Sequence, residues 1–176
     1  KSYIAKIFGY PVFNADDEVA KLYKKDKRIF RKLKNVLPKY IYSFPISKNE
    51  ISKAILVNKN NLKKIVKVIH YEIRKKMYVF LKKNKFKKIV ILDIPLLLEN
   101  RINKKNDVLI FIKSEKSEII KRLKKRKNFN QKLFKKFKAL QLPLDYKMKK
   151  SQFIIKNNFK KNSVKKDVKL ILEKLL

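Results

Sequence analysis

The stretch Lys88-Ile89-Val90-Ile91-Leu92-Asp93 decides the fold class. It is a continuous apolar run with no polar alternation until its end, which is typical of a strand buried on both faces of a parallel sheet. Two further apolar runs, at residues 108–112 and 153–155, predict two more strands. Helical periodicity separates these runs, so the sequence predicts an α/β fold in which helices flank a parallel sheet. In such folds the ligand site lies beyond the carboxyl ends of the strands.

The remaining segments are predicted from apolar spacing and from turn residues. A short extended piece is expected at residues 11–15, and loops with Pro38 and Pro45 at residues 37–47. A helix follows, with Ser47 or Asn49 as its N-cap. Residues 26–36 show no clear pattern. Further helices are expected at residues 2–8, 17–25, 60–85, 115–127, 130–141 and 143–149, and a last one places Val164, Val168, Ile171, Leu172 and Leu175 on one stripe.

Length and composition limit the class of protein. The 176 residues, 45% of them hydrophobic, suffice for one domain with a sizeable core. The absence of cysteine excludes a disulfide scaffold, and with His70 as the single histidine a structural zinc site is excluded as well. The longest apolar stretch, residues 89–98, contains an Asp and a Pro and is shorter than the about 20 residues that span a bilayer. We therefore expect a cytoplasmic protein with no membrane partner; oligomeric state cannot be predicted.

The net charge of +36 is the most extreme feature of the composition. A strongly basic chain suggests nucleic acid or an anionic membrane as a partner. However, only six of the 50 basic residues are arginine. Nucleic-acid recognition favours arginine because of its forked guanidinium. Lys, Asn, Ile, Phe and Tyr all have A/T-rich codons, so a biased genome explains the charge, and solvated basic faces are the commoner meaning of such runs. The composition therefore argues against nucleic acid.

The chain opens inside a predicted helix with Lys1-Ser2. A parallel sheet needs a strand before that helix, so we expect a strand and a glycine-rich turn upstream of Lys1. Lys-Ser would then end the P-loop signature G-x-x-x-x-G-K-[ST], in which the backbone cradles phosphates, the Lys reaches the β/γ-phosphates and the hydroxyl binds Mg²⁺. The dipeptide alone is a weak signal, since Gly9 cannot supply that turn.

An ordered set of motifs accompanies Lys1-Ser2, and with it the chain resembles the dephospho-CoA kinase family of P-loop kinases. The match extends over nearly the whole chain, and the segment from Asp93 to Glu99 is its most specific part. The matching positions are Lys1-Ser2-Tyr3, Val12-Phe13-Asn14-Ala15-Asp16, Lys48-Asn49-Glu50-Ile51, His70-Tyr71, Asp93-Ile94-Pro95-Leu96-Leu97-Leu98-Glu99, Arg122 to Arg126, Gln141 and Ile154-Ile155-Lys156-Asn157. The chain departs from the family pattern at Asn14, Lys48, Tyr71 and Lys156, which puts acceptor contacts in more doubt than the chemistry.

The resemblance implies transfer of the γ-phosphoryl group of ATP, with Mg²⁺, to the ribose 3′-hydroxyl of dephospho-CoA. It further implies a single P-loop kinase-like domain over residues 1–176, with a helical lid at about 115–150 and a helical acceptor region at 37–86. Another P-loop kinase, such as a nucleoside monophosphate kinase, and a non-catalytic basic nucleic-acid-binding protein are the alternatives.

The same resemblance assigns the candidate site residues. Lys1 would hold phosphate oxygens, Ser2 would bind Mg²⁺ and Asp16 would accept or orient the proton of the attacking hydroxyl. Arg122 and Arg126, four residues apart on the predicted helix 115–127, would close on the triphosphate, although a solvated basic face is the ordinary meaning of such a pair. Asn157 either contacts the nucleotide or caps a turn. The acceptor would be bound by Asp16, Lys48, His70, Pro95, Leu96, Leu97 and Glu99. A histidine such as His70 is more often a packed or surface residue than a functional one. Pro95 to Leu97 could form only a turn with core packing, but their position at the end of a strand favours a wall of the acceptor pocket.

Overall fold

The computed structural model describes residues 2–126 and 129–176. The chain divides into two compact units. The central unit comprises Phe13–Pro95, and the terminal unit comprises Lys1–Val12 together with Leu96–Leu176. Each unit contains one two-stranded sheet in its described residues, and each is described by itself below.

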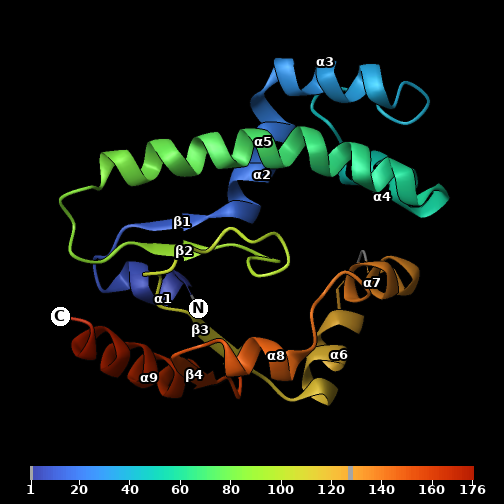
Figure 1. Cartoon of the computed structure of the whole chain (residues 1–176). Helices are drawn as coiled ribbons and strands as arrows, with labels where there is room; N and C mark the ends of the chain where they lie inside the picture. The colour runs from blue at the N-terminus through green and yellow to red at the C-terminus, as the bar shows by residue number, and fades with distance from the viewer. Residues whose placement is uncertain (1, 127–128) are drawn as a thin grey trace. The chain divides into compact units, whose positions relative to one another are not determined.

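The central unit is built around one long helix (Figure 1). This helix, α5, spans Lys59–Lys83, and α2, α3 and α4 all contact it. Strands β1 and β2 pair with each other in the unit's sheet. The bounds of the other elements are Val12–Asn14 for β1, Ala15–Lys25 for α2, Lys27–Val36 for α3, Lys48–Val57 for α4 and Ile91–Asp93 for β2.

Side-chain caps fix where the helices of the central unit begin. Asn14, Asp26 and Asn58 accept backbone N–H groups at the starts of α2, α3 and α5. Ser47 and Glu50 form a capping box at the start of α4, which confirms Ser47 rather than Asn49 as the cap. The predicted helix at 60–85 is confirmed, since α5 covers 59–83.

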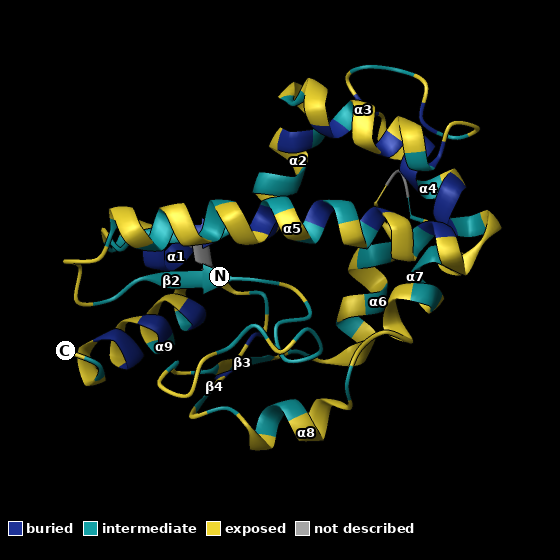
Figure 2. Cartoon of the chain, turned by 45° about the horizontal axis from the view of Figure 1, so that its top comes forward, coloured by how far each residue is buried: buried dark blue, intermediate teal, exposed yellow. Residues whose placement is uncertain are grey.

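Helix α3 is the element that the sequence did not predict. It buries Ile29 and Leu33, which lie one helical turn apart, while lysines and arginines occupy most of its other positions. Figure 2 shows the buried positions as dark blue bands on α3, α4 and α5. Burial of these bands holds the helices together, because each band removes apolar surface from water.

The prediction of a strand over 88–93, buried on both faces, is wrong in length and in burial. Only Ile91–Asp93 forms strand β2, and its residues are half-buried. The physical reason is pairing: within the described residues β2 shares a sheet with β1 alone. A two-stranded sheet offers few neighbouring side chains to cover those of β2, and Lys88, at the start of the predicted strand, is exposed.

The terminal unit combines a parallel strand pair with helices. Strand β3 (Ile110–Lys113) pairs in parallel with β4 (Phe153–Lys156), in register from Ile110 opposite Phe153 to Lys113 opposite Lys156. Helix α9 packs on β4 and on α1. The helices are α1 (Ser2–Ile7), α6 (Lys116–Lys124), α7 (Gln131–Lys138), α8 (Leu144–Lys149) and α9 (Lys161–Lys174). The α/β class with parallel strands flanked by helices is therefore confirmed.

The core of the terminal unit lies between α9, β4 and α1. Val164, Val168, Ile171 and Leu172 are buried on one face of α9, as the predicted stripe requires, while Leu175 beyond the helix end is half-buried. In the part of the chain that the structure describes, no helix combines the length and the apolar character needed to cross a membrane.

Candidate functional site

The carboxyl ends of β1 and β2 meet in the central unit. Asn14, the last residue of β1, donates its side-chain amide to the carboxylate of Asp93, the last residue of β2, at 3.1 Å. The amide oxygen of Asn14 accepts the backbone N–H of Asp17 at 3.0 Å and so caps α2. Asn14 thus uses both ends of its amide, and a carboxylate at this position could not donate to Asp93.

Asp16 lies in the first turn of α2, directly after this junction. Asp16 is exposed as a whole residue, but partial shielding of its carboxyl from water raises the pKa above the ordinary value of 3.8, and the charges of Asp93 and then Asp17 raise it further. Asp17 and Glu18 share the same helical turn. A carboxylate whose pKa is raised is a stronger base than an ordinary aspartate, and Asp16 lies at a strand end where α/β folds bind ligands.

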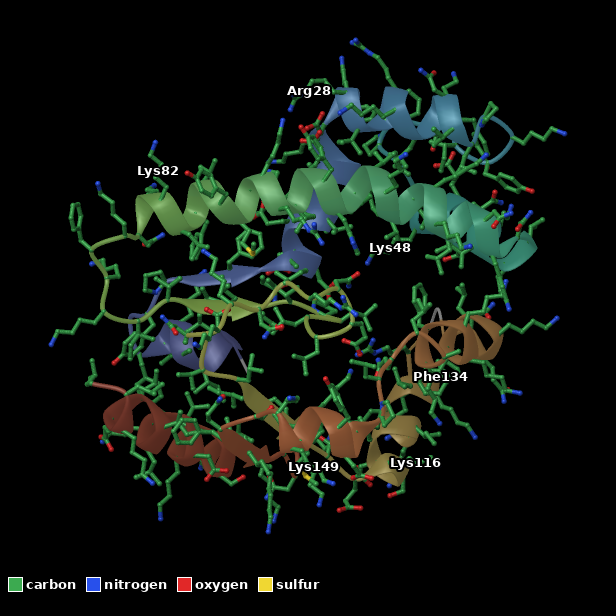
Figure 3. All side chains as sticks on the ribbon, viewed as in Figure 1. Arg28, Lys48, Lys82, Lys116, Phe134 and Lys149 are labelled. Atoms are coloured by element: carbon green, nitrogen blue, oxygen red, sulfur yellow. The ribbon has the colours of Figure 1, made fainter. Side chains whose placement is uncertain are left out.

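The other candidates in the central unit lie on helices and at the end of the unit. Lys48 is the exposed first residue of α4 (Figure 3). His70 is half-buried on α5, and burial followed by the charge of Arg74 lowers its pKa below 6.5. The imidazole is therefore neutral at pH 7. Pro95 is exposed and ends the unit.

Residues 95–101 form consecutive turns, as expected for a loop after β2. Leu96 adopts a left-handed backbone conformation with φ 56°, and its carbonyl accepts the backbone and side-chain N–H groups of Asn100. Leu96 and Leu97 are half-buried. These residues belong to the terminal unit, so the division between the units falls inside the motif that runs from Asp93 to Glu99.

Glu99 is held by contacts within the terminal unit. One carboxylate oxygen accepts the backbone N–H of Leu142 at 2.9 Å and lies 2.5 Å from the ammonium of Lys147. Burial alone would raise the pKa of Glu99, but the bonds from Lys147 and from backbone N–H groups outweigh it and lower the pKa. Glu99 also lines a cavity of about 420 Å³ together with Arg101 and Tyr146.

The predicted phosphate-binding residues fall at the edge of the described chain. Lys1 lies outside the described residues. Ser2 begins α1. The roles assigned to both residues stay predictions. Within residues 2–126 and 129–176, no group of three or more histidine, cysteine, aspartate or glutamate side chains could hold a metal ion.

The sequence suggested that Arg122 and Arg126 share one helical face, but in the structure they do not. Helix α6 ends at Lys124, and the N–H of Arg126 bonds to the carbonyl of Leu123 at 3.0 Å, so Arg126 lies in the turn beyond the helix. The reason is that no apolar residue follows Leu123 until Phe129, which leaves nothing to bury on a further helical turn. The two arginines nevertheless line one cavity of about 650 Å³.

Asn157 follows β4 and is 5% exposed. Its backbone N–H bonds to the carbonyl of Lys113 at 2.7 Å, and its side-chain amide donates to the hydroxyl of Ser114 at 2.8 Å. Its side-chain oxygen accepts the N–H of Phe159 at 3.2 Å. These contacts are those of a turn-forming residue at the carboxyl ends of β3 and β4.

Three features of these sites were not predicted from the sequence. They are the bond between Asn14 and Asp93, the bond between Glu99 and Lys147, and the position of Phe159 against Arg122. The charges of Glu99 and Lys147 lie 48 positions apart, so spacing gives no signal for that pair. Asp93 carried a signal, because it is the polar residue that ends an apolar run.

Comparison with known proteins identifies the family. The family model for dephospho-CoA kinase matches residues 1–163. The dephospho-CoA kinase of Wolbachia sp. subsp. Brugia malayi is 33% identical over 180 residues, covering 99% of this chain and 92% of that protein. The dephospho-CoA kinase of Bartonella quintana is 30% identical over 170 residues, covering 96% of this chain and 87% of that protein.

Solved structures share the fold. A crystal structure of a Thermus thermophilus protein superposes with a TM-score of 0.78 at 19% identity, covering 99% of this chain and 89% of that one. A dephospho-CoA kinase from Campylobacter jejuni superposes with a TM-score of 0.64 at 20% identity, covering 98% and 88%. The sequence comparisons carry the assignment and the structural ones agree with it: the chain belongs to the dephospho-CoA kinase family.

Proposed function

We propose that this chain transfers the γ-phosphoryl group of ATP to the ribose 3′-hydroxyl of dephospho-CoA. The products are ADP and coenzyme A, so the reaction is the last step of coenzyme A biosynthesis. The family match over residues 1–163 supports this function. The observation that carries the proposal is the Asp16 carboxyl, whose pKa is raised, next to the junction of β1 and β2.

Phosphoryl transfer requires an oriented nucleophile and neutralised charge more than covalent chemistry. Asp16 orients the 3′-hydroxyl and accepts its proton as the oxygen attacks the γ-phosphorus, and the proton later leaves to solvent. Lys1 holds the β- and γ-phosphates, and Arg122 and Arg126 spread the negative charge that develops on the transferred group. Asn157 shapes the turn beside the arginine-lined cavity and so bounds the nucleotide.

The residues that we assign to the acceptor are Asp16, Lys48, His70, Pro95, Leu96, Leu97 and Glu99. The exposed ammonium of Lys48 suits the phosphates of dephospho-CoA. His70, neutral at pH 7, offers a hydrogen bond rather than a charge. Leu96 and Leu97 give an apolar wall, and Glu99 anchors that wall to Leu142 and Lys147. Residues 37–86 form the acceptor region and residues 115–150 the lid of a single kinase domain.

Mg²⁺ fits the small set of oxygen donors in this chain. The ion takes one or two protein oxygens and completes its shell with substrate phosphates and water, so it needs no cluster of three side chains. The hydroxyl of Ser2 would be the protein ligand. Bound there, Mg²⁺ would neutralise phosphate charge.

The distribution of the basic side chains favours a metabolic role in the cytoplasm over nucleic-acid binding. Every helix that the structure describes carries exposed lysine. Figure 3 shows long basic side chains extending outward from both units, among them Arg28, Lys82, Lys116 and Lys149. A nucleic-acid footprint would concentrate the charge on one face or along one groove.

Steady-state transfer from ATP to dephospho-CoA, followed by chromatography of coenzyme A, tests the proposal. Asp16→Asn should lower kcat by roughly two to four orders of magnitude, the usual contribution of a general base, with little change in nucleotide binding. The matched control is Asp17→Asn, which removes a charge from the same helical turn and should cost at most a few-fold. These assays use the protein with the strand and glycine-rich turn expected upstream of Lys1. Equal, small losses in the two variants would overturn the role of Asp16, and no transfer by that protein without a substitution would overturn the function.

A further inference from the structure

Phe159 has a backbone conformation that a bulky residue rarely adopts. Its φ is 64°, in the left-handed region where a side chain is sterically unfavourable. Such conformations persist where the surroundings impose them, and they gather at functional sites. The contacts of Phe159 show what holds it in this conformation.

Asn157 holds the peptide group that precedes Phe159. The buried side chain of Asn157 accepts the N–H of Phe159, and its amide is fixed in turn by Ser114. The backbone N–H of Asn157 is bound by Lys113 at the end of β3. The turn after β4 is thus tied to β3, and this tie determines where the ring of Phe159 points.

The ring of Phe159 lies against the guanidinium of Arg122. The central carbon of that group is 4.2 Å from the ring centroid, which is a close cation–π contact. The Arg122 side chain also faces Glu118, one helical turn earlier, whose carboxylate is 3.9 Å from Nε. Arg122 and Phe159 both line the cavity of about 650 Å³, together with Ser114 and Arg126.

We propose that Phe159 is a positioning residue that holds Arg122 ready for the triphosphate, an inference that rests on the proposed function. A guanidinium stacked by its face keeps its N–H groups in the plane of the fork, where they remain available to phosphate oxygens. The stack also restricts the rotamers of a side chain that otherwise loses much conformational entropy on binding. Phe159 therefore acts through Arg122 and need not touch the substrate.

Kinetics with paired variants test this role. Phe159→Leu keeps the apolar bulk and the backbone requirement but removes the aromatic face, and should lower kcat/KM for ATP about two- to fivefold, the size of an exposed cation–π contact. KM for dephospho-CoA should not change, and Phe159→Tyr, which keeps the face, should restore kcat/KM. In an Arg122→Gln background, Phe159→Leu should have no further effect. An equal loss in both backgrounds, or no loss in either, would overturn the proposal.

A second measurement is independent of activity. The chain contains no tryptophan, so Phe159→Trp introduces a single tryptophan at the stack, and its fluorescence can be excited selectively over that of the eight tyrosines. Adding Arg122→Gln should expose the indole and increase its quenching by acrylamide, whereas the control Arg126→Gln, in the same cavity, should not. Unchanged quenching with Arg122→Gln would overturn the contact. If the unmutated protein transfers no phosphoryl group, the proposed function fails, while the quenching result still decides whether residue 159 holds Arg122.

Discussion

Glu50→Gln is expected to destabilise the central unit although it removes only a charge. Glu50 is 2% exposed, and its carboxylate accepts three backbone N–H groups. Those of Tyr42 and Ser43 bind one oxygen at 3.1 and 2.9 Å, and that of Ser47 binds the other at 3.0 Å. Burial alone would raise the pKa of Glu50, but these N–H groups outweigh it and lower the pKa below 4.5.

The magnitude follows from what a glutamine can still accept. Its amide oxygen can keep the N–H groups of Tyr42 and Ser43, but its NH₂ then faces the N–H of Ser47, which loses its acceptor. Because Ser47 is exposed, the loss of its bond costs about 1 kcal/mol, and the two remaining bonds lose their charge assistance, at about 1 kcal/mol each. The expected loss in the free energy of unfolding is about 3 kcal/mol, a large share of the ~5–15 kcal/mol typical of a domain.

Urea unfolding followed by circular dichroism measures this loss. The control is Glu115→Gln, because Glu115 is exposed and makes no capping bond at the start of α6. The folded pKa of Glu50 is lowered, so its contribution is present above the unfolded pKa of 4.5 and is lost as the pH falls through the folded pKa. The two proteins should therefore differ at pH 7 and converge in acid. A difference below about 0.5 kcal/mol at pH 7, the size of an ordinary surface effect, would refute the reasoning, and so would one that persists unchanged in acid.

Three further predictions concern the carboxylates near the proposed site. Because the pKa of Asp16 is raised and the base must be ionised, kcat should fall as the pH decreases through a value above 3.8; an acid limb unaffected by Asp16→Asn would contradict this. Asn14→Asp should move that limb to higher pH, since a third carboxylate would replace the amide that donates to Asp93; an unmoved limb in the pH–rate profile would show that the three groups are not coupled. Glu99→Gln should lower the free energy of unfolding by about 3 kcal/mol, because it leaves the largely buried ammonium of Lys147 unpaired; Lys147→Met in the same protein should recover part of that loss in urea unfolding, and no recovery would place the cost elsewhere.

The long amphipathic helix, the start of α4 at Ser47 or Asn49 and the apolar strands near 108–112 and 153–155 could all be predicted from the sequence. In each case the signal is local: helical spacing, a serine three residues before a glutamate, or a continuous apolar run. Helix α3 escaped prediction because Ile29 and Leu33 are its only fully buried side chains and lysines surround them. The length of β2 escaped it because strand length depends on the partner strand, which the run itself does not specify.

In the candidate sites, too, local features could be predicted and long-range contacts could not. The motif from Asp93 to Glu99 could be recognised from its residue types, but the contacts of Glu99 with Leu142 and Lys147 are long-range and appear only in the fold. The position of Arg126 beyond α6 depends on where apolar packing stops. A left-handed conformation at a phenylalanine runs against local propensity, so no rule that reads residues one by one would predict it at Phe159.

The division of the chain has a consequence for folding during synthesis. The central unit is continuous in sequence, so all its contacts can form once residue 95 has left the ribosome. Helix α1 belongs to the other unit and packs on α9, more than 150 positions later. Its apolar side chains Ile4 and Ala5, which are buried in the folded chain, therefore lack their packing partner until the residues of α9 have been made. Contacts so distant in sequence form slowly, and exposed apolar segments aggregate, so α1 is among the last elements of this chain to find its packing partner and is open to aggregation until then.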